Sequence, residues 1–292
     1  MQTSVRLFLA VVCLALTTSL AQAQIRVAVE DGSANGTGAA VVAQLNDDTY
    51  FDFYATLVVA ADIDTAGELA AYDVVVLGGS GFTNADWTAP MAAALRAWVE
   101  AGGGAVFTGW GNLELPTAPG AADLEAIMPT QNIPSTNEFG YSLNTIDILA
   151  AHPVVDGIPD FAVGDFTEDC CIEGNAFPAE AGDTVLATMT LENPAGPGIV
   201  VAVKQPGAGC TAYLGPIYFG SATQYPDVTP ALRSGYPDQL LEQAADWAAT
   251  CFEAPVAQAI PTLSAAGAAA LVGTLVLAGV VLLRRRSRLD RA

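Results

Sequence analysis

An uncharged run of nineteen residues near the end of the chain limits the possible architectures most. It spans Ala265–Leu283 and is followed at once by an arginine cluster that begins at Arg284. Nineteen helical residues at about 1.5 Å each cover roughly 28 Å, enough for the hydrocarbon core of a bilayer. Arginines next to a membrane helix stay on the cytoplasmic side. The sequence therefore predicts a transmembrane helix over 265–283 and an Arg-rich cytoplasmic tail over 284–292, with the preceding chain on the opposite side of the membrane.

The other end of the chain has the pattern of a secretory signal peptide. Arg6 supplies the positive charge, and Leu7–Leu16 is an apolar run too short to span a bilayer comfortably. Ala21-Gln22-Ala23 is a small-x-small cleavage site. We predict a signal peptide over 1–23, cut between Ala23 and Gln24, with an uncleaved anchor as the alternative. An export signal and a membrane anchor together predict a single-pass inner-membrane protein with its domain in the periplasm.

A short motif precedes the apolar run. It reads Ile260-Pro261-Thr262-Leu263-Ser264, with Gly267 shortly after. Motif, helix and arginine cluster over 260–292 resemble the IPTL-type (IPTL-CTERM) C-terminal sorting domain, which exosortases process in Gram-negative bacteria. That family continues with Glu-Trp-Gly, where this chain has Ala265-Ala266-Gly267. The resemblance implies an exosortase-type enzyme as a partner and transfer to the cell surface, and a permanent anchor is the alternative. Residues 253–259 are interpreted as a short linker.

Charge is distributed very unevenly along the chain. The whole sequence has a formal charge of -21. Between Gln24 and Ala259 only four residues are basic against 30 acidic ones, so this segment carries 4 − 30 = -26. Such a surface repels phosphate backbones, which excludes nucleic acid as a partner. The charge also predicts self-repulsion at low ionic strength.

Four cysteines remain after removal of the signal peptide: Cys170, Cys171, Cys210 and Cys251. An even number in an exported chain suggests two disulfides. Adjacent cysteines rarely bridge each other, so we expect Cys170 and Cys171 to pair separately with Cys210 and Cys251, in either combination. Four thiolates binding zinc are the alternative. Paired Cys-x-x-Cys spacing is absent from the sequence, which argues against zinc. We assign no metal ligand and no cofactor from the sequence.

The segment 24–252 has the alternating pattern of a single α/β domain. Tyr72–Gly79 is nearly all apolar and ends in glycines, which is typical of a strand buried on both faces. Trp87–Val99 carries an apolar stripe at helical spacing, for which Asn84 or Asp86 is the expected N-cap, and Ala105–Thr108 is the next strand. We therefore predict a doubly wound, mostly parallel, flavodoxin-like sheet. The other expected elements are strands over 25–29, 51–59, 184–189, 198–204 and 211–214, and helices over 39–45 and 238–250.

This layout resembles the class I glutamine amidotransferase-like fold and, within it, the trehalose-utilisation-type branch. Besides the strand at 72–79, three segments carry the likeness: the strand and turn at 105–111, the His-Pro-x-x-x-Gly-like segment that begins at His152, and the closing helix that follows Tyr236. In that fold a cysteine in the turn after the strand is activated by a histidine. Here the turn reads Thr108-Gly109-Trp110-Gly111, with Trp110 at the nucleophile position. A late His-x-Glu pair is absent, so no catalytic residue is assigned.

Further candidate groups are weaker. The glycines and side chains expected above the strand ends form a candidate ligand cleft consisting of Gly79, Ser80, Phe82, Trp110 and His152. Phe82, Trp87 and Trp110 are candidates for an aromatic floor under a sugar. The acidic stretch Asp165, Glu168, Asp169 and Glu173 offers oxygen ligands for calcium, and a solvated loop is the alternative.

Two functional hypotheses follow from these features. The first is an exported, membrane-anchored or sorted surface protein whose amidotransferase-like domain is non-catalytic and acts as a binding or structural module, with a cell-surface polysaccharide as a candidate partner. The alternative is an extracytoplasmic hydrolase, for instance one directed at carbohydrates, whose catalytic acids are unassigned.

Overall fold

The computed structural model describes 11 segments, all within the predicted α/β domain: 24–31, 38–78, 87–109, 111, 115–130, 137–140, 144–163, 172–175, 183–192, 195–219 and 230–251. Contacts divide the chain into two units, 1–252 and 253–292. The predicted signal peptide, linker, sorting motif and transmembrane helix lie outside the described residues. Within the described segments, no helix has the length and hydropathy needed to cross a bilayer.

Five parallel strands form one half of the sheet, in the order β2–β1–β3–β4–β11. Strands β3, β4 and β11 are buried along their whole length. Apolar sequences are typical of such central strands, which helices cover on both faces. The bounds are β1 Ile25–Asp31, β2 Phe53–Val58, β3 Val74–Gly78, β4 Gly104–Thr108 and β11 Cys210–Leu214.

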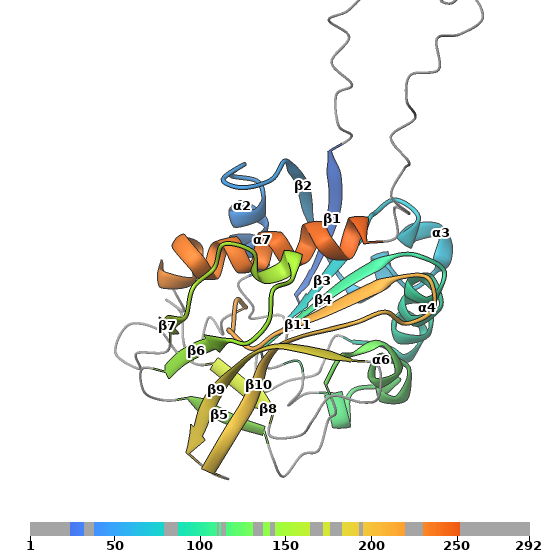
Figure 1. Ribbon diagram of the computed structural model, residues 1–292. Helices are drawn as coiled ribbons and strands as arrows, with labels where there is room; N and C mark the ends of the chain where they lie inside the picture. Colours follow the sequence, from blue (N-terminus) through green and yellow to red (C-terminus); the bar gives the residue numbers. More distant parts are fainter. Residues whose placement is uncertain are drawn as a thin grey trace, which may run out of the picture. The chain divides into compact units, whose positions relative to one another are not determined.

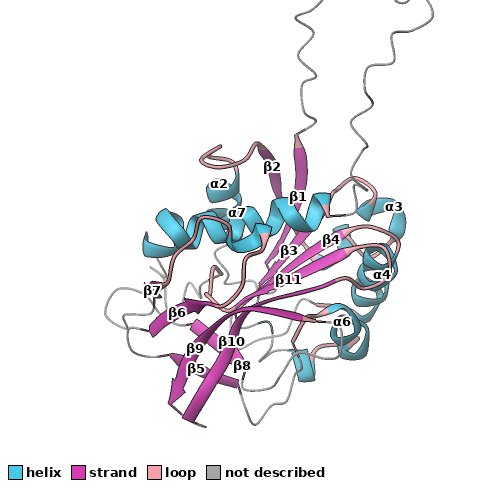
Figure 2. Cartoon of the chain, in the orientation of Figure 1, coloured by secondary structure: helices cyan, strands magenta, loops and turns pink. Residues whose placement is uncertain are grey.

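The other half of the sheet is antiparallel, so the prediction of a mostly parallel sheet is wrong. The described strands make four parallel pairings and six antiparallel ones. Only two residues separate β9 from β10, and so short a connection permits an antiparallel hairpin but no crossover. Figure 2 shows this long hairpin extending beyond the helices. The bounds are β5 Asn137–Gly140, β6 Asn144–Ile148, β7 Phe161–Val163, β8 Ile172–Asn175, β9 Thr184–Glu192 and β10 Ala195–Lys204.

Helices cover both faces of the parallel half, which confirms the doubly wound prediction. Along β3, Val74 and Val76 pack in one core with α2 and α7, whereas Val75 and Leu77 pack in a second core with α3, α4 and α6. Figure 1 shows the two groups of helices on opposite sides of the strands. The α-helices are α2 Gly38–Leu45, α3 Ala66–Leu69, α4 Ala89–Glu100, α6 Ala121–Ile127 and α7 Gly235–Thr250. The 3₁₀ turns are η1 Ala60–Asp62, η2 Leu115–Thr117, η3 Pro153–Val155 and η4 Pro230–Arg233.

Helix α4 follows the predicted apolar stripe but begins later than expected. Met91, Leu95 and Val99 are fully buried. The N-cap is Thr88, whose Oγ1 accepts a hydrogen bond from the Met91 N–H at 3.3 Å, and the predicted caps Asn84 and Asp86 lie outside the described residues. Threonine is an effective cap because its hydroxyl satisfies a free N–H in the first turn.

One disulfide joins Cys210 at the start of β11 to Cys251 at the end of α7, and the two Cα atoms are 6.3 Å apart. A disulfide is thereby confirmed, but both predicted pairings are wrong. The cysteines expected as their partners, Cys170 and Cys171, lie outside the described residues. The tertiary structure instead packs the end of α7 on the amino ends of the strands, where Ala248 contacts Gly104.

One residue in the middle of the outer edge of β2 is bonded by a side chain of the same chain. The Ala55 N–H donates to Asn46 Oδ1 at 2.7 Å, and Asn46 Nδ2 donates back to the Ala55 carbonyl at 2.9 Å. Both backbone groups of Ala55 are therefore satisfied as they would be by another strand. This contact protects an edge that exposes Tyr54 and Leu57 and would otherwise invite pairing with another chain.

Candidate functional site

The predicted nucleophile turn follows β4 at the carboxyl edge of the parallel strands. Thr108 is fully buried, and its Oγ1 donates to the Leu77 carbonyl at 3.2 Å. Gly109 lies so close to the segment after β11 that a Cβ on it would be 2.3 Å from the Gly215 carbonyl oxygen. Close packing therefore requires glycine at position 109. The Thr108 hydroxyl is engaged in a hydrogen bond to the neighbouring strand β3. Gly111 is buried, and Trp110 lies outside the described residues.

The other residues proposed for the cleft at this edge are not described, apart from His152. Gly79, Ser80 and Phe82 lie outside the described residues, so the cleft stays a prediction. Trp87, a third candidate for the aromatic floor, is only 2% exposed, and its Nε1 donates to Glu30 Oε2 at 2.6 Å. A ring buried in this way cannot stack on a sugar, so Trp87 belongs to the core.

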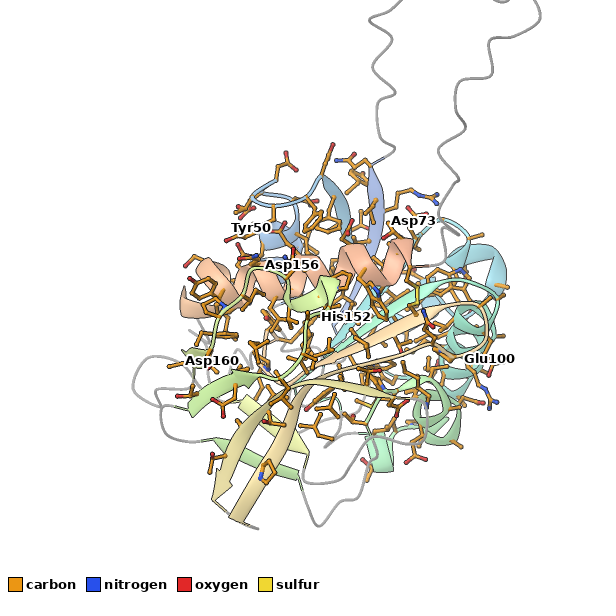
Figure 3. The ribbon with its side chains drawn as sticks, in the orientation of Figure 1. Tyr50, Asp73, Glu100, His152, Asp156 and Asp160 are labelled. Atoms are coloured by element: carbon orange, nitrogen blue, oxygen red, sulfur yellow. A yellow bond between two sulfur atoms is a disulfide. The ribbon has the colours of Figure 1, made fainter. Side chains whose placement is uncertain are left out.

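His152, the only histidine of the chain, lies beside helix α7. It is the N-cap of η3, and its Nδ1 accepts a hydrogen bond from the Val154 N–H at 3.2 Å. Its ring meets the Trp247 ring nearly edge-on, with the centroids 5.0 Å apart. Burial lowers the pKa of His152, so the ring is neutral at pH 7, with its proton on Nε2. Figure 3 shows His152 and Asp156 on the segment that runs beside α7.

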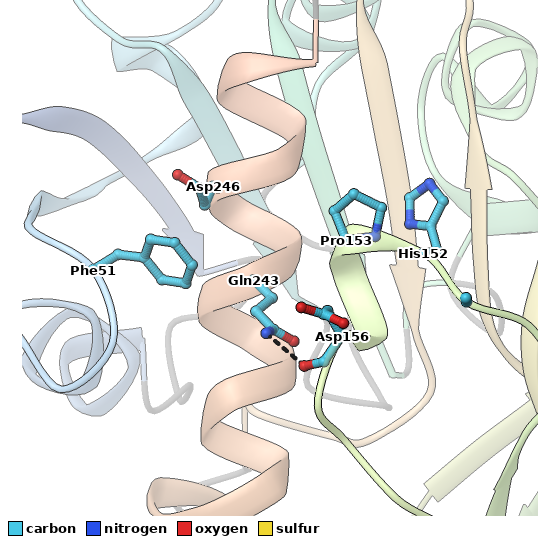
Figure 4. A pocket seen from close by; sticks show the side chains of 7 residues that line it. Phe51, His152, Pro153, Asp156, Gln243 and Asp246 are labelled. Carbon is cyan, nitrogen blue, oxygen red and sulfur yellow. Dashed lines mark hydrogen bonds between the residues drawn. The ribbon is translucent and has the colours of Figure 1, made fainter.

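A groove of about 490 Å³ runs along the exposed face of α7. Figure 4 shows the helix between Phe51 on one side and the η3 segment with His152 and Pro153 on the other. We call this feature the α7 groove. Its lining residues come from three parts of the chain that are distant in sequence. They are Phe51, Ala151, His152, Pro153, Asp156, Gln243 and Asp246. Thr108, Gly109 and Gly111 of the predicted nucleophile turn are not among them.

Polar groups in the α7 groove are mostly acceptors. Gln243 Nε2 donates to the Asp156 carbonyl at 2.9 Å, and Gln239 Nε2 donates to the same oxygen at 3.2 Å. These bonds hold the η3 segment against α7. Gln243 Oε1 is buried and has no hydrogen-bond partner among the described residues. Burial raises the pKa of Asp246, which has no ion pair within the described part of the chain.

A second carboxyl group of α7, Glu242, holds one wall of the groove in place. Glu242 is fully buried, and its Oε2 accepts from the N–H groups of Tyr50 at 3.1 Å and Phe51 at 3.0 Å. Burial raises the pKa of Glu242 to about 7, and the neighbouring Asp238 adds to this effect. The position of the Phe51 ring therefore depends on a glutamate beneath it.

The start of α7 is fastened by a buried polar network. Gln44 Nε2 donates to Asp238 Oδ1 at 2.6 Å and to the Leu232 carbonyl at 2.9 Å. Arg233 donates to Gln44 Oε1 and, at 2.6 Å, to the Tyr218 carbonyl. These bonds tie α2, η4, α7 and the segment after β11 together.

Sequence reasoning did not identify Phe51, Asp156, Glu242, Gln243 or Asp246. One local signal was present, because Glu242 lies among the inward-facing apolar residues of α7. The groove itself had no sequence signal, since the three segments that form it meet only in the folded domain.

Metal sites receive no support from the described residues. No group of three or more histidine, cysteine, aspartate or glutamate side chains within those segments is arranged to hold a metal ion. The proposed calcium ligands Asp165, Glu168 and Asp169 lie outside them, and for Glu173 only the backbone, in β8, is described.

The signal-cleavage residue Ala23 and the sorting-motif residues 260–264 and Gly267 also lie outside the described segments. Gln24 is exposed, and its side chain donates to the Phe53 carbonyl at 2.9 Å.

Solved structures similar to this chain share its fold at low sequence identity. A ThuA-like protein from Parabacteroides merdae is 17% identical, with a TM-score of 0.55 over 78% of this chain and 91% of that one. A cytoplasmic protein from Salmonella typhimurium is 14% identical, with a TM-score of 0.51 over 77% of this chain and 98% of that one. No protein-family model and no curated protein matches the sequence. These likenesses support the amidotransferase-like fold predicted from the sequence, and they concern the fold alone.

Proposed function

We propose that this chain is an exported protein, anchored in the inner membrane or sorted to the cell surface of a Gram-negative bacterium, whose α/β domain is a non-catalytic binding module. The N-terminal signal-peptide pattern and the C-terminal IPTL-type segment support export and tethering. The disulfide between Cys210 and Cys251 supports an oxidising compartment. The ThuA-like fold provides the scaffold, and folds of this kind host many functions.

The position of His152 carries the proposal of a non-catalytic domain. Nucleophilic catalysis of the amidotransferase type needs a base within hydrogen-bond reach of the nucleophile. The single histidine of this chain lines the α7 groove, and its Nδ1 is occupied by its own turn. In the predicted nucleophile turn, the hydroxyl of Thr108 is buried and donates a hydrogen bond to the Leu77 carbonyl of β3. The described groups therefore supply neither an activated nucleophile nor a base for it.

The α7 groove supports a binding function. It has apolar walls, formed by Phe51 and Pro153, and polar groups placed along its floor, which is the usual composition of a small-ligand site. Its walls are held by specific bonds from α7, those of Glu242 on one side and Gln243 on the other. Such a prearranged groove can bind a ligand without a large rearrangement of the domain.

The tethering part of the proposal is tested by peptide mapping of the mature termini in the native host, after separation of membrane and surface fractions. A mature N-terminus at Gln24 and a C-terminus near Thr262 or Ser264 are expected for a sorted protein. An intact tail beyond Arg284 in the membrane fraction would support a permanent anchor. An N-terminus at Met1 together with a cytoplasmic location would overturn the proposal of export.

The non-catalytic part is tested by assaying the purified full-length protein in neutral detergent for turnover of glutamine and of a panel of nitrophenyl glycosides. No turnover above background is expected. Turnover that disappears in Thr108→Ala, Trp110→Ala or His152→Ala, while the fold is retained by circular dichroism, would refute this part. It would establish the hydrolase alternative.

A further inference from the structure

Residues 46–52 connect α2 to β2 at the surface of the domain, and we call them the 46–52 segment. Its residues are exposed except Phe51, which is half-buried, and Figure 4 shows the Phe51 side chain directed toward α7. The segment contains three aspartates and no basic residue. Both of its ends are fastened. Asn46 bonds to β2 at one end, and at the other the Asp52 carbonyl accepts from the first N–H of β1.

The middle of the 46–52 segment is held to the domain by one buried carboxyl group. Glu242 of α7 is fully buried, and its Oε2 accepts from the N–H groups of both Tyr50 and Phe51. Among the described residues, one other hydrogen bond joins residues 48–51 to the rest of the domain. It is a long one, 3.4 Å from the Tyr50 hydroxyl to the Gly235 carbonyl. The attachment of this segment therefore depends on the state of Glu242.

The surroundings of Glu242 favour its protonated form. Burial, together with the charges of Asp238 on the same helix and Asp47 in the segment, raises the pKa of Glu242 to about 7. Tyr50 stays neutral, because burial and the nearby acids raise its pKa. Within the described segments Glu242 makes no ion pair, and its Oε1 is buried without a hydrogen-bond partner. A buried carboxylate without a countercharge is costly, so ionisation favours any conformation that exposes it to water.

The other elements packed against α7 bring no free cation to this place in the described part of the chain. The strands beneath the helix contribute apolar side chains to the shared core, and α2 has no charged residue. From η3 come the neutral ring of His152 and a further acid, Asp156, and Asp246 is the next acid along α7. Arg233 of η4 is engaged by the Gln44 amide and a backbone carbonyl.

We infer that Glu242 is a proton-dependent switch, which holds the 46–52 segment on α7 while its carboxyl group is protonated and releases the segment when that group ionises. Release brings the carboxylate into water and separates it from Asp47. Because Phe51 belongs to the segment, release also removes one wall of the α7 groove. The inference concerns the movement of this wall and is independent of what the groove binds.

The test is hydrogen exchange of the full-length protein in neutral detergent at pH 5 and pH 8, resolved to single amides by mass spectrometry with electron-transfer fragmentation. Each rate is divided by the intrinsic exchange rate at that pH. In the closed structure Glu242 keeps its proton until about pH 7, whereas an exposed glutamate loses it near pH 4.5. Opening therefore releases a proton between these values, and protection of the Tyr50 and Phe51 amides should fall about 50-fold from pH 5 to pH 8.

The amides of Leu95 and Val99, two fully buried residues of α4, are the internal reference. They exchange only when larger parts of the domain open, so they should be better protected than the amides of Tyr50 and Phe51 at both pH values. Equal protection of the two pairs would show that the 46–52 segment is released only by global unfolding, and would overturn the inference. So would protection of Tyr50 and Phe51 that does not change with pH.

The variant Glu242→Gln removes the titrating group, so protection of the Tyr50 and Phe51 amides should differ by less than about threefold between pH 5 and pH 8. The matched control Glu125→Gln removes the same charge from an exposed position on α6, on the opposite face of the sheet, and should retain the full decrease. A full decrease in Glu242→Gln would assign the switch to another group and overturn the inference. If Glu242→Gln does not fold, the measurement on the unmodified protein still decides. Export and turnover are measured separately and are unaffected by either outcome.

Discussion

Replacing Glu242 by glutamine should raise the free energy of unfolding at pH 8. It should also remove the contribution that this carboxyl group makes to the pH dependence of stability. The carboxyl group is fully buried, and burial raises its pKa from 4.5 to about 7. In the unfolded chain this group loses its proton near pH 4.5, whereas the folded protein keeps it until about pH 7. The folded state therefore binds more protons between these values, so the free energy of unfolding falls as the pH rises through that window.

The magnitude follows from the size of the shift. Each pKa unit corresponds to about 1.4 kcal/mol, so a shift of this size lowers stability at pH 8 by about 3 kcal/mol relative to pH 4. Glutamine keeps an oxygen that accepts the N–H groups of Tyr50 and Phe51. However, it places an amide N–H₂ where Glu242 Oε1 now has no partner, which costs about 1 kcal/mol. The expected net gain at pH 8 is about 2 kcal/mol, or a rise in Tm of about 4–8 °C.

The assay is thermal and urea unfolding followed by circular dichroism at pH 5 and pH 8. At pH 5 the variant should be no more stable than the unmodified protein, because Glu242 is then protonated. Glu125→Gln, at an exposed position, is the control and should leave the pH dependence unchanged. Asp238 and Asp246, whose pKa values are also raised by burial, remain in the variant and retain a weaker slope of the same sign. A variant that is less stable at both pH values would show that the ionised carboxylate is net stabilising and would refute the reasoning.

Three other predictions concern the edge strand, the disulfide and the charge. Asn46→Ala removes both hydrogen bonds to Ala55, so we expect the free energy of unfolding in urea to fall by about 1–2 kcal/mol and light scattering on warming to increase. An unchanged onset temperature of scattering would contradict the protective role of Asn46. Replacing Cys210 and Cys251 together by serine opens a loop with a sequence separation of 41 residues, so we expect a loss of about 4 kcal/mol, and a loss below about 1 kcal/mol would show that the crosslink barely constrains the unfolded chain. Because the segment 24–259 carries 4 − 30 = -26, the melting temperature should rise with sodium chloride and with calcium, and a flat response would remove self-repulsion as a factor.

The parallel half of the fold was predictable because its signals are local. The apolar run Tyr72–Gly79 contains β3, and the stripe of Met91, Leu95 and Val99 forms the buried face of α4. Burial on both faces and helical periodicity are written in adjacent residues, so no knowledge of distant contacts is needed. The cap of α4 was missed because several polar residues precede the stripe, and only the backbone geometry selects Thr88.

The antiparallel half and the candidate site were not predictable in this way. Strands β9 and β10 were expected as strands, but over 184–189 and 198–204, so the two-residue connection that makes them an antiparallel hairpin appears only in the structure. His152 was expected in a ligand cleft above the strand ends, whereas its ring contacts Trp247 and it lines the α7 groove. Residues of the α7 groove that are distant in sequence meet only when α7 packs, so no local pattern marks them.

The sequence by itself determined the domain type, its acidic charge, and the expectation of a signal peptide and a C-terminal sorting segment. These features depend on composition and on periodicity within short windows. The tertiary structure decided which cysteines form the disulfide and the antiparallel direction of strands β10, β9, β6 and β7. It also decided that Phe51, Asp156 and Asp246 line one groove. Those outcomes depend on how α7 lies across the sheet. That placement is the sum of many weak contacts between residues far apart in the chain, and no single segment records it.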